Sequence, residues 1–252
     1  MARASTPAKP PATRKGTSVA TNDLQAQIAA RIAAEIDKQK EKVGNASGNK
    51  IKVGKKGFEL PDGNTRNEIE VVIVDFVSVN SYFDRPYDPD TPAPPACFSI
   101  SIVPKGMLPS ENSPATQCDN CDQCPQNQFG SALVGKGKAC KNNRRLAVMP
   151  ENADDKTEPW LLDVAPTSIK SFDSLIRTLT NGGMMPFQIV AKVSLDDSVD
   201  YPKLEFEALD ALELERQAFF MDARDKAAEL LMAEPDVSQY EAPKPKGARA
   251  RK

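Results

Sequence analysis

Four of the chain's five cysteines lie in one polar segment, at positions 118, 121, 124 and 140. Two cysteines separated by two residues present both sulfurs to one metal ion through a tight turn, and a further ligand closes a tetrahedral thiolate site. The intervening Asp, Asn and Gln residues are too polar for a core of buried free thiols. Because the chain has no histidine, any metal must be held by thiolates or carboxylates. The sequence therefore predicts a metal site in this segment.

Five cysteines compete for the four places of such a site. Cys121, Cys124 and Cys140 are common to both ligand sets that we consider. Local spacing adds Cys118 as the fourth ligand, although three ligands within seven residues strain a tetrahedron. The alternative fourth ligand is Cys97, which lies outside the segment. The spacing alone leaves this choice open.

Zinc is the metal that this ligand pattern favours. The alternative is an iron–sulfur cluster, because C-x2-C-x2-C followed by a proline is similar to half of a bacterial ferredoxin motif. That motif needs a fourth cysteine where Gln128 stands, and Pro125 comes too early. We therefore expect Zn²⁺ and keep an iron–sulfur cluster as the alternative cofactor.

A basic, glycine-rich stretch follows the cysteines. No acidic residue lies between Asp122 and Glu151. Cations beside an aromatic ring suit a groove that holds phosphates and stacks bases, whereas the alternative is an ordinary solvated charged surface. The proline-rich loop before Cys97 supplies further aromatic residues in a polar setting. The candidate nucleic-acid contacts are Lys136, Lys138, Lys141, Arg144, Arg145, Phe129, Tyr82, Phe83 and Tyr87.

Several catalytic classes are excluded. The absence of histidine removes Ser-His-Asp and Cys-His catalysis. Gly130, Gly135 and Lys136 nearly spell a phosphate loop, but Gly137 stands where the magnesium-binding Ser or Thr is needed. No compact set of carboxylates points to a nuclease. We therefore expect a protein that is not an enzyme.

Composition divides the chain into a core with basic ends. Both ends are poor in apolar residues and rich in Lys, Arg and Pro, so they cannot offset the entropy of ordering. The net charge of the whole chain is only −2, which gives no global attraction for nucleic acid. The expected parts are a basic tail over 1–20, a helix (23–42) and linker over 21–60, a core over 61–235 with a zinc knuckle at 118–145, and a basic tail over 236–252.

Hydrophobic periodicity predicts a mainly β, α+β core. A helix between the third and fourth of five strands is the element order of the OB-fold, a small Greek-key barrel. We expect an OB-like barrel with a zinc-binding insertion and flanking helices. The predicted strands cover 68–79, 97–103, a split third strand at 144–149 and 159–164, 186–195 and 201–209, and the predicted helices cover 166–183 and 210–233.

One part of the sequence resembles a family of bacteriophage and prophage proteins, some of which are described as single-stranded DNA-binding. The resemblance lies in "PPACFSI", "CDQCPQNQFGSALVGKGKACKNNRRLAV" and "PWLLDVAPTSIKSF", and covers roughly residues 95–180. It carries Cys121, Cys124 and Cys140 over directly, and its upstream Pro-x-Cys falls on Cys97, which favours Cys97 as the fourth ligand. Proteins of this kind often end in an acidic tail that recruits partners, whereas this sequence ends in "KPKGARARK".

These observations together predict a single-stranded DNA-binding protein of phage replication or recombination, without catalysis. The alternative is a zinc-stabilised interaction protein that contacts phage or host replication or transcription proteins. An iron–sulfur protein or a nuclease is a weaker alternative. No apolar run approaches the roughly 18 residues that a membrane span needs, and no signal-peptide core is present. We therefore expect no membrane contact, and the resemblance implies the cytoplasm of an infected bacterial host.

Overall fold

The computed structural model describes residues 27–28, 31–32, 48–86, 88 and 92–242. The chain divides into two units, Met1–Gly48 and Asn49–Lys252, and each is considered by itself. In the first unit residues 27–28 and 31–32 are helical, in agreement with the helix predicted over 23–42. The remainder of that helix, the tail over 1–20 and residues 243–252 lie outside the described residues.

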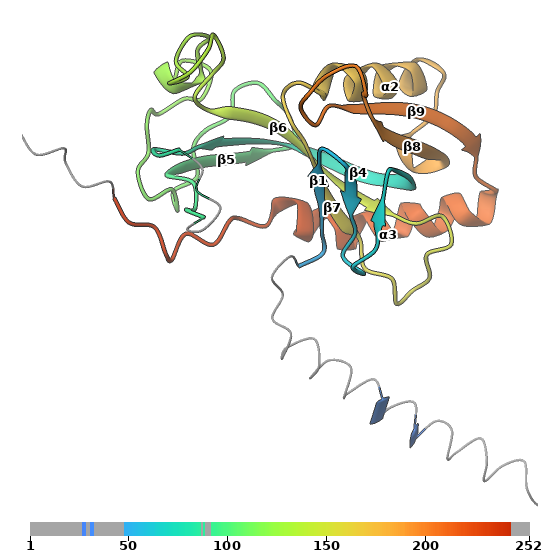
Figure 1. The fold of residues 1–252 in the computed structure, drawn as a ribbon. Coiled ribbons are helices and arrows are strands. Elements are labelled where there is room, and N and C mark those ends of the chain that lie inside the picture. The colour runs from blue at the N-terminus through green and yellow to red at the C-terminus, as the bar shows by residue number, and fades with distance from the viewer. Residues whose placement is uncertain (1–26, 29–30, 33–47, 87, 89–91, 243–252) are drawn as a thin grey trace, which may run out of the picture. The chain divides into compact units, whose positions relative to one another are not determined.

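Within the described residues the second unit has one nine-stranded sheet (Figure 1). Along the main path the strands follow the order β3 (Thr65–Arg66), β2 (Gly57–Glu59), β1 (Lys50–Gly54), β7 (Trp160–Val164), β6 (Lys141–Met149), β4 (Glu68–Tyr82), β8 (Ile189–Leu195) and β9 (Leu204–Ala211). The remaining strand, β5 (Cys97–Ser101), pairs with the end of β4 off this path. The one parallel pairing given for these strands joins β1 to β7.

Strand β4 organises the sheet. Its 15 residues are rich in Val and Ile, which fit a pleated, buried surface. It pairs with β8 through residues 68–71, with β6 through 72–81, and with β5 through 78–82. A register shift between Ile73 and Asp75 lies where the pairing passes from one partner to the next, and such a bulge increases local twist. The strand predicted over 68–79 is therefore confirmed, and it extends to Tyr82.

The centre of the sheet is buried on both faces because a helix covers each of them (Figure 1). Val71 and Ile73 of β4 pack in the core that contains α2 (Ile169–Asn181), whereas Val72 and Val74 pack in the core that contains α3 (Leu214–Met232). Burial of both faces explains why residues 71–74 form a continuous apolar run instead of an alternating one. The helix residues that close the two cores are Phe172, Leu175 and Leu179 of α2, and Phe220, Ala227 and Leu231 of α3.

The two long helices agree closely with the predictions. Helix α2 covers Ile169–Asn181 inside the predicted 166–183, and it ends at Gly182 and Gly183, the latter with φ of 74°. Helix α3 covers Leu214–Met232 inside the predicted 210–233. None of the helices in the described part of the chain is long and apolar enough to cross a membrane.

The mainly β, α+β class is confirmed, but two details of the predicted strands are wrong. The split third strand is two separate antiparallel strands, β6 and β7, so β5 is an additional strand beside β4 and not the second of five. Residues 50–66, placed mostly in a linker, form β1, β2 and β3. Their short runs between glycines become strands because β1 finds a partner in β7, more than a hundred residues away in sequence.

Candidate metal centre and nucleic-acid groove

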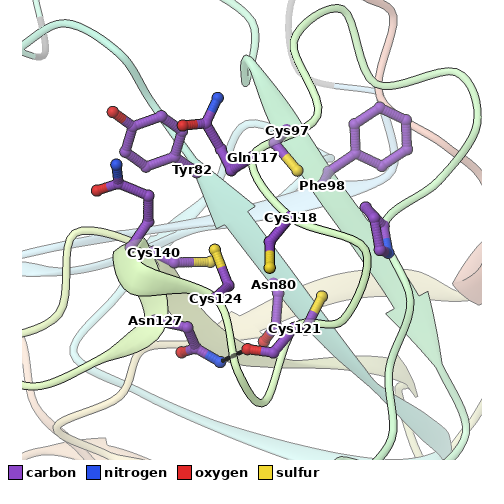
Figure 2. A pocket seen from close by; sticks show the side chains of 12 residues that line it. Asn80, Tyr82, Cys97, Phe98, Gln117, Cys118, Cys121, Cys124, Asn127 and Cys140 are labelled. Atoms are coloured by element: carbon purple, nitrogen blue, oxygen red, sulfur yellow. Dashed lines mark hydrogen bonds between the residues drawn. The ribbon is translucent and has the colours of Figure 1, made fainter.

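All five cysteines line one narrow cavity. Cys97 begins β5, Cys140 immediately precedes β6, and the other three lie on the loop between these strands. Figure 2 shows their side chains around a common space near the end of β4. The cavity has a volume of about 20 Å³, which is room for about one water-sized atom. The structure thus brings together both predicted ligand sets, including Cys97 from outside the segment.

Backbone hydrogen bonds shape the loop that carries Cys118, Cys121 and Cys124. The amide of Cys121 donates to the carbonyl of Met107 at 3.0 Å, and the amide of Cys140 donates to the carbonyl of Gln126 at 2.8 Å. The short helical turn η1 (Pro125–Asn127) directly follows Cys124. The buried Asn127 side chain donates to the carbonyl of Cys121 at 2.7 Å. Polar contacts therefore hold this loop, whose sequence is poor in apolar residues.

The thiols are all free, and three of them are buried. The pKa of Cys140 is raised to about 12, chiefly by burial and then by the nearby Cys121, Cys124 and Cys97, while Lys138 lowers it. Burial also raises the pKa of Cys121, against hydrogen bonds from Asn80 and Ser99. Burial disfavours the thiolate form of these cysteines, and a bound dication would stabilise that form.

The donor set fits a thiophilic metal by type and number. Cysteine thiolates are the ligands that Zn²⁺ takes in structural sites built from four cysteines, and five cysteines line this cavity. In the described part of the chain, however, no group of three or more Cys, Asp or Glu side chains has the arrangement of a formed metal site. The residues therefore suit zinc, but the side chains are not placed as they are around a coordinated ion.

Lys138 joins the cysteine loop to the sheet. Its ammonium lies 3.2 Å from Asn127 Oδ1 and 3.0 Å from Asn142 Oδ1. Asn142 of β6 in turn donates to Asn80 of β4 at 2.6 Å. The same ammonium lies 5.3 Å from the centre of the Phe129 ring, which is 83% exposed. Lys138 thus fixes the position of the loop. Its ammonium also makes a cation–π contact with the exposed Phe129 ring.

The two predicted arginine contacts are engaged with the protein itself. Arg144 lies 3.6 Å from the carboxylate of Asp173 on α2. Arg145 donates to the carbonyls of Leu231 and Ala233, at 3.0 and 2.7 Å, where α3 ends. Burial lowers the pKa of Arg145, and the nearby Asp163 opposes that shift. These arginines pair the sheet to its two helices.

Lys136 and Lys141 remain exposed. Lys141 opens β6, and its ammonium contacts the carbonyl of Lys138 at 3.2 Å. Lys136 lies in the glycine-rich turn, which is closed by the amide of Gly130 donating to the carbonyl of Gly137 at 2.9 Å. The predicted basic strip is therefore divided: Lys136 and Lys141 face solvent, Lys138 is bonded within the loop, and the arginines face the protein.

A groove of about 630 Å³ separates the end of β4 from the glycine-rich loop. Tyr82, Phe83 and Lys141 are among the residues that line it. Tyr82 and Gln126 also line the cysteine cavity, so the groove and the cavity share a wall. Tyr87, also predicted as a contact, lies outside the described residues.

Three side chains that bear on binding are among the groove residues not identified from the sequence. Arg85 follows the predicted aromatic pair, and Leu133 and Val134 occupy the tip of the glycine-rich loop. The two apolar side chains are 88% and 89% exposed. The sequence could have indicated Leu133 and Val134 as exposed contacts, because they form an apolar pair between glycines in a polar segment that offers no core to bury them.

Comparison of the chain with protein-family models, with curated proteins and with solved structures finds no match.

Proposed function

We propose that the protein binds single-stranded DNA in the groove between the end of β4 and the glycine-rich loop, without catalysis. The observation that carries this proposal is the convergence of two distant segments, 82–86 and 131–141, on one groove. One segment supplies aromatic rings, and the other supplies apolar side chains and a lysine. Stacking surfaces beside cations are the two components of sequence-tolerant binding to single strands.

In this proposal the bases stack and the phosphates follow the cations. Phe83 is 44% exposed, so its ring face is open to a base. Lys141 and Arg85 stand at the groove, and Lys136 is exposed on the adjoining loop. Such contacts read no base edges, so binding depends weakly on sequence and strongly on salt. A role in phage replication or recombination follows from the sequence resemblance and is part of the proposal.

The strand order supports an OB-like core. The path β7-β6-β4-β8-β9 contains five strands, and α2 lies between the third and the fourth of them along the chain. If these are the five barrel strands, residues 83–140 form the connection between the first two. That connection and the one between the last two strands bind oligonucleotides in OB-folds. Both the groove and the cysteine loop belong to the first connection.

We also propose that Zn²⁺ binds in the cysteine cavity through Cys121, Cys124, Cys140 and Cys97. Cys97 is fixed in β5, where it pairs with Tyr82 of β4, whereas Cys118 shares one loop with two other ligands. Four thiolates from a strand, a loop and the start of β6 would be joined by one ion. Because Tyr82 and Gln126 line both spaces, the metal would stiffen one wall of the groove.

Titration of fluorescent oligo-dT at two salt concentrations tests the DNA-binding proposal. We expect micromolar or tighter affinity at low salt and a steep loss at higher salt. Unchanged anisotropy over the whole protein range at low salt contradicts the proposal. Elemental mass spectrometry of the same preparation tests the metal, with about one zinc per chain expected. A colourless anaerobic preparation argues against an iron–sulfur cluster.

A second candidate function is a contact with another protein. The loop after β5 exposes Ile102 and Leu108, which are 77% and 63% accessible. Exposed apolar side chains in a short loop are a common feature of interaction surfaces. This candidate is favoured if a phage or host replication or transcription protein is retained in a pull-down while oligo-dT is not bound. Binding of oligo-dT through the groove favours the first.

A further inference from the structure

The cysteine cavity holds one thiol more than a zinc ion can use. A structural zinc ion takes four ligands in a tetrahedron, whereas all five cysteines line the cavity. The set proposed above leaves out Cys118. The cavity has room for about one water-sized atom, so the thiol left over lies beside the ligands and not in a separate site. Cys118 is therefore a free thiol in contact with the space that the metal would fill.

Cys118 is open to solvent, whereas the cysteine next to it in the motif is not. Cys118 is half-buried, but Cys121, Cys124 and Cys140 are buried. An oxidant in solution reacts with an accessible thiol before it reaches a buried one. Cys97 is also half-buried, but it is a proposed ligand, and β5 fixes it opposite Tyr82. Among the thiols outside the ligand set, Cys118 is the one that an oxidant would meet.

The spacing of the motif gives Cys121 two possible partners. Cys118 and Cys121 are separated by two residues, and the chain bends between them at Asp119. Cysteines with this spacing form the reversible disulfides of redox proteins. Cys121 and Cys124 have the same spacing and are both proposed zinc ligands. A sulfur in a disulfide is no longer a thiolate, so Cys121 can serve the metal or Cys118, but not both at once.

The backbone allows Cys118 to move toward a fixed Cys121. The amide of Cys121 donates to the carbonyl of Met107 at 3.0 Å, and the carbonyl of Cys121 accepts from the Asn127 side chain at 2.7 Å. In the part of the chain that the structure describes, no hydrogen bond holds Cys118. Formation of a disulfide between the two therefore needs a shift of Cys118 alone, and the bonds that shape the loop around Cys121 can persist.

We propose that Cys118 and Cys121 form a disulfide when peroxide is present, and that this disulfide releases the zinc ion. The inference rests on the zinc site proposed above. Hydrogen peroxide oxidises the Cys118 thiol to a sulfenic acid and leaves as water. The Cys121 thiolate leaves the metal and attacks the Cys118 sulfur, and the hydroxide that departs takes a proton from solvent to form a second water. Each sulfur is oxidised by one electron, and one peroxide molecule is reduced.

Loss of the ion would reach the groove through the wall that the two spaces share. Tyr82 and Gln126 line both the cavity and the groove. The carbonyl of Gln126 accepts from the amide of Cys140, one of the proposed ligands. Three thiolates hold zinc less well than four, so the metal leaves and this wall becomes less rigid. Oxidation would therefore weaken the binding of single-stranded DNA, and a thiol reductant with zinc would restore it.

Zinc release under peroxide tests the proposal. The full chain is purified with its metal and treated with hydrogen peroxide, while a chromogenic chelator reports free zinc. We expect about one zinc per chain to be released. Cys118→Ser is the matched control, because it keeps all four proposed ligands. We expect it to release zinc at least about fivefold more slowly, since its remaining thiols are bound to the metal. Equal rates in the two proteins contradict the inference.

Mass spectrometry locates the disulfide. Free thiols of the oxidised chain are blocked with one reagent, the disulfides are then reduced, and the thiols that appear are labelled with a second reagent. Fragment ions should place the second label on Cys118 and Cys121. A disulfide between Cys121 and Cys124, or a gain of oxygen atoms without any disulfide, contradicts the inference.

These outcomes separate the inference from the proposed function. If the purified chain holds zinc and Cys118→Ser loses it as fast as the unaltered protein, the inference is wrong and the zinc site stands. If the purified chain holds no zinc, both are wrong. Cys118→Ser that is purified without zinc also contradicts the inference, because Cys118 would then be a ligand. A chain that fails to bind oligo-dT contradicts the DNA-binding proposal, while the release of zinc still decides the role of Cys118.

Discussion

The Arg145 guanidinium donates a hydrogen bond to the carbonyl oxygen of Ala233 at 2.7 Å, where α3 ends. A second bond reaches the carbonyl of Leu231 at 3.0 Å. The last carbonyls of a helix have no partner within the helix, and a cation at this end also interacts favourably with the helix dipole. Arg145 therefore couples β6 to α3, although its place in a basic run suggested a contact with DNA.

Replacement of Arg145 tests this structural role. We expect Arg145→Ala to lower the free energy of unfolding by about 2 kcal/mol, because it leaves two carbonyls without their charged donor. Urea denaturation followed by circular dichroism measures the loss. Lys141→Ala is the matched control, since Lys141 is exposed and lines the groove. Lys141→Ala should leave the free energy of unfolding unchanged and weaken oligo-dT binding. If Lys141→Ala lowers the stability and Arg145→Ala weakens only the binding, the assignment of Lys141 to the groove and of Arg145 to the fold is wrong.

Phe83 is the test of base stacking in the groove. We expect Phe83→Ala to weaken oligo-dT binding about fivefold or more, because stacking of one base on an aromatic ring contributes about 1–3 kcal/mol. Fluorescence anisotropy at constant salt measures the change.

Tyr201→Ala is the matched control for Phe83. Tyr201 is 49% exposed and follows β8, whose Ser194 pairs with Glu68 at the opposite end of β4 from Tyr82. This variant should bind oligo-dT as the unaltered protein does. If the two variants lose equal affinity for oligo-dT, exposed aromatic residues contribute to binding wherever they lie, and the groove is not the binding site.

The proposed ligand set can be tested with single cysteine variants. We expect Cys121→Ser, Cys140→Ser and Cys97→Ser to lose bound zinc, because each removes one of four thiolate ligands, and Cys118→Ser to retain about one zinc per chain. Elemental mass spectrometry of protein purified under reducing conditions gives the ratio. Zinc retained by Cys97→Ser and lost by Cys118→Ser would move the fourth ligand to Cys118. An unaltered protein without zinc would contradict the metal site.

Local sequence patterns were sufficient to predict the elements whose apolar residues form a long run or recur with a clear period. The apolar run of β4 and the amphipathic pattern of α2 each determine an element that the structure contains. Strand β1 differs, because its five residues KIKVG become a strand through parallel pairing with β7. Pairing between segments so far apart in sequence leaves no local pattern that could predict it.

The same distinction applies to the candidate site. The spacing of Cys121 and Cys124 within one turn pointed to their proximity, and Cys97 was placed beside them by resemblance. The roles of the basic residues were not predictable, because a charge run does not reveal its partners. Lys141 and Arg145 are close in sequence, yet one faces the groove and the other faces the end of α3.

A pH titration tests the polar contacts in the turn between β8 and β9. Asp196 accepts hydrogen bonds from the Lys203 ammonium at 2.5 Å and from the hydroxyl and amide of Ser198. These bonds lower its pKa to about 2 from the ordinary 3.8, with the Lys203 bond as the largest cause. A carboxyl whose pKa is lower in the folded state stabilises that state above its ordinary pKa. The contribution is therefore present above about pH 4 and is lost as the pH falls toward 2.

The carboxyl carbon shift of Asp196, followed by NMR between about pH 6 and about 1.5, should give a midpoint of its pKa near 2. Lys203→Met removes the largest cause, so the midpoint should rise toward 3.8. The unaltered protein and the variant are titrated in the same buffers, so that the comparison does not depend on the pH scale. A midpoint near 3.8 in the unaltered protein would show that the Lys203 contact does not persist in solution. The backbone hydrogen bonds of the hairpin would remain, including the ladder between β8 and β9 and the bond from the Asp196 amide to the Lys203 carbonyl.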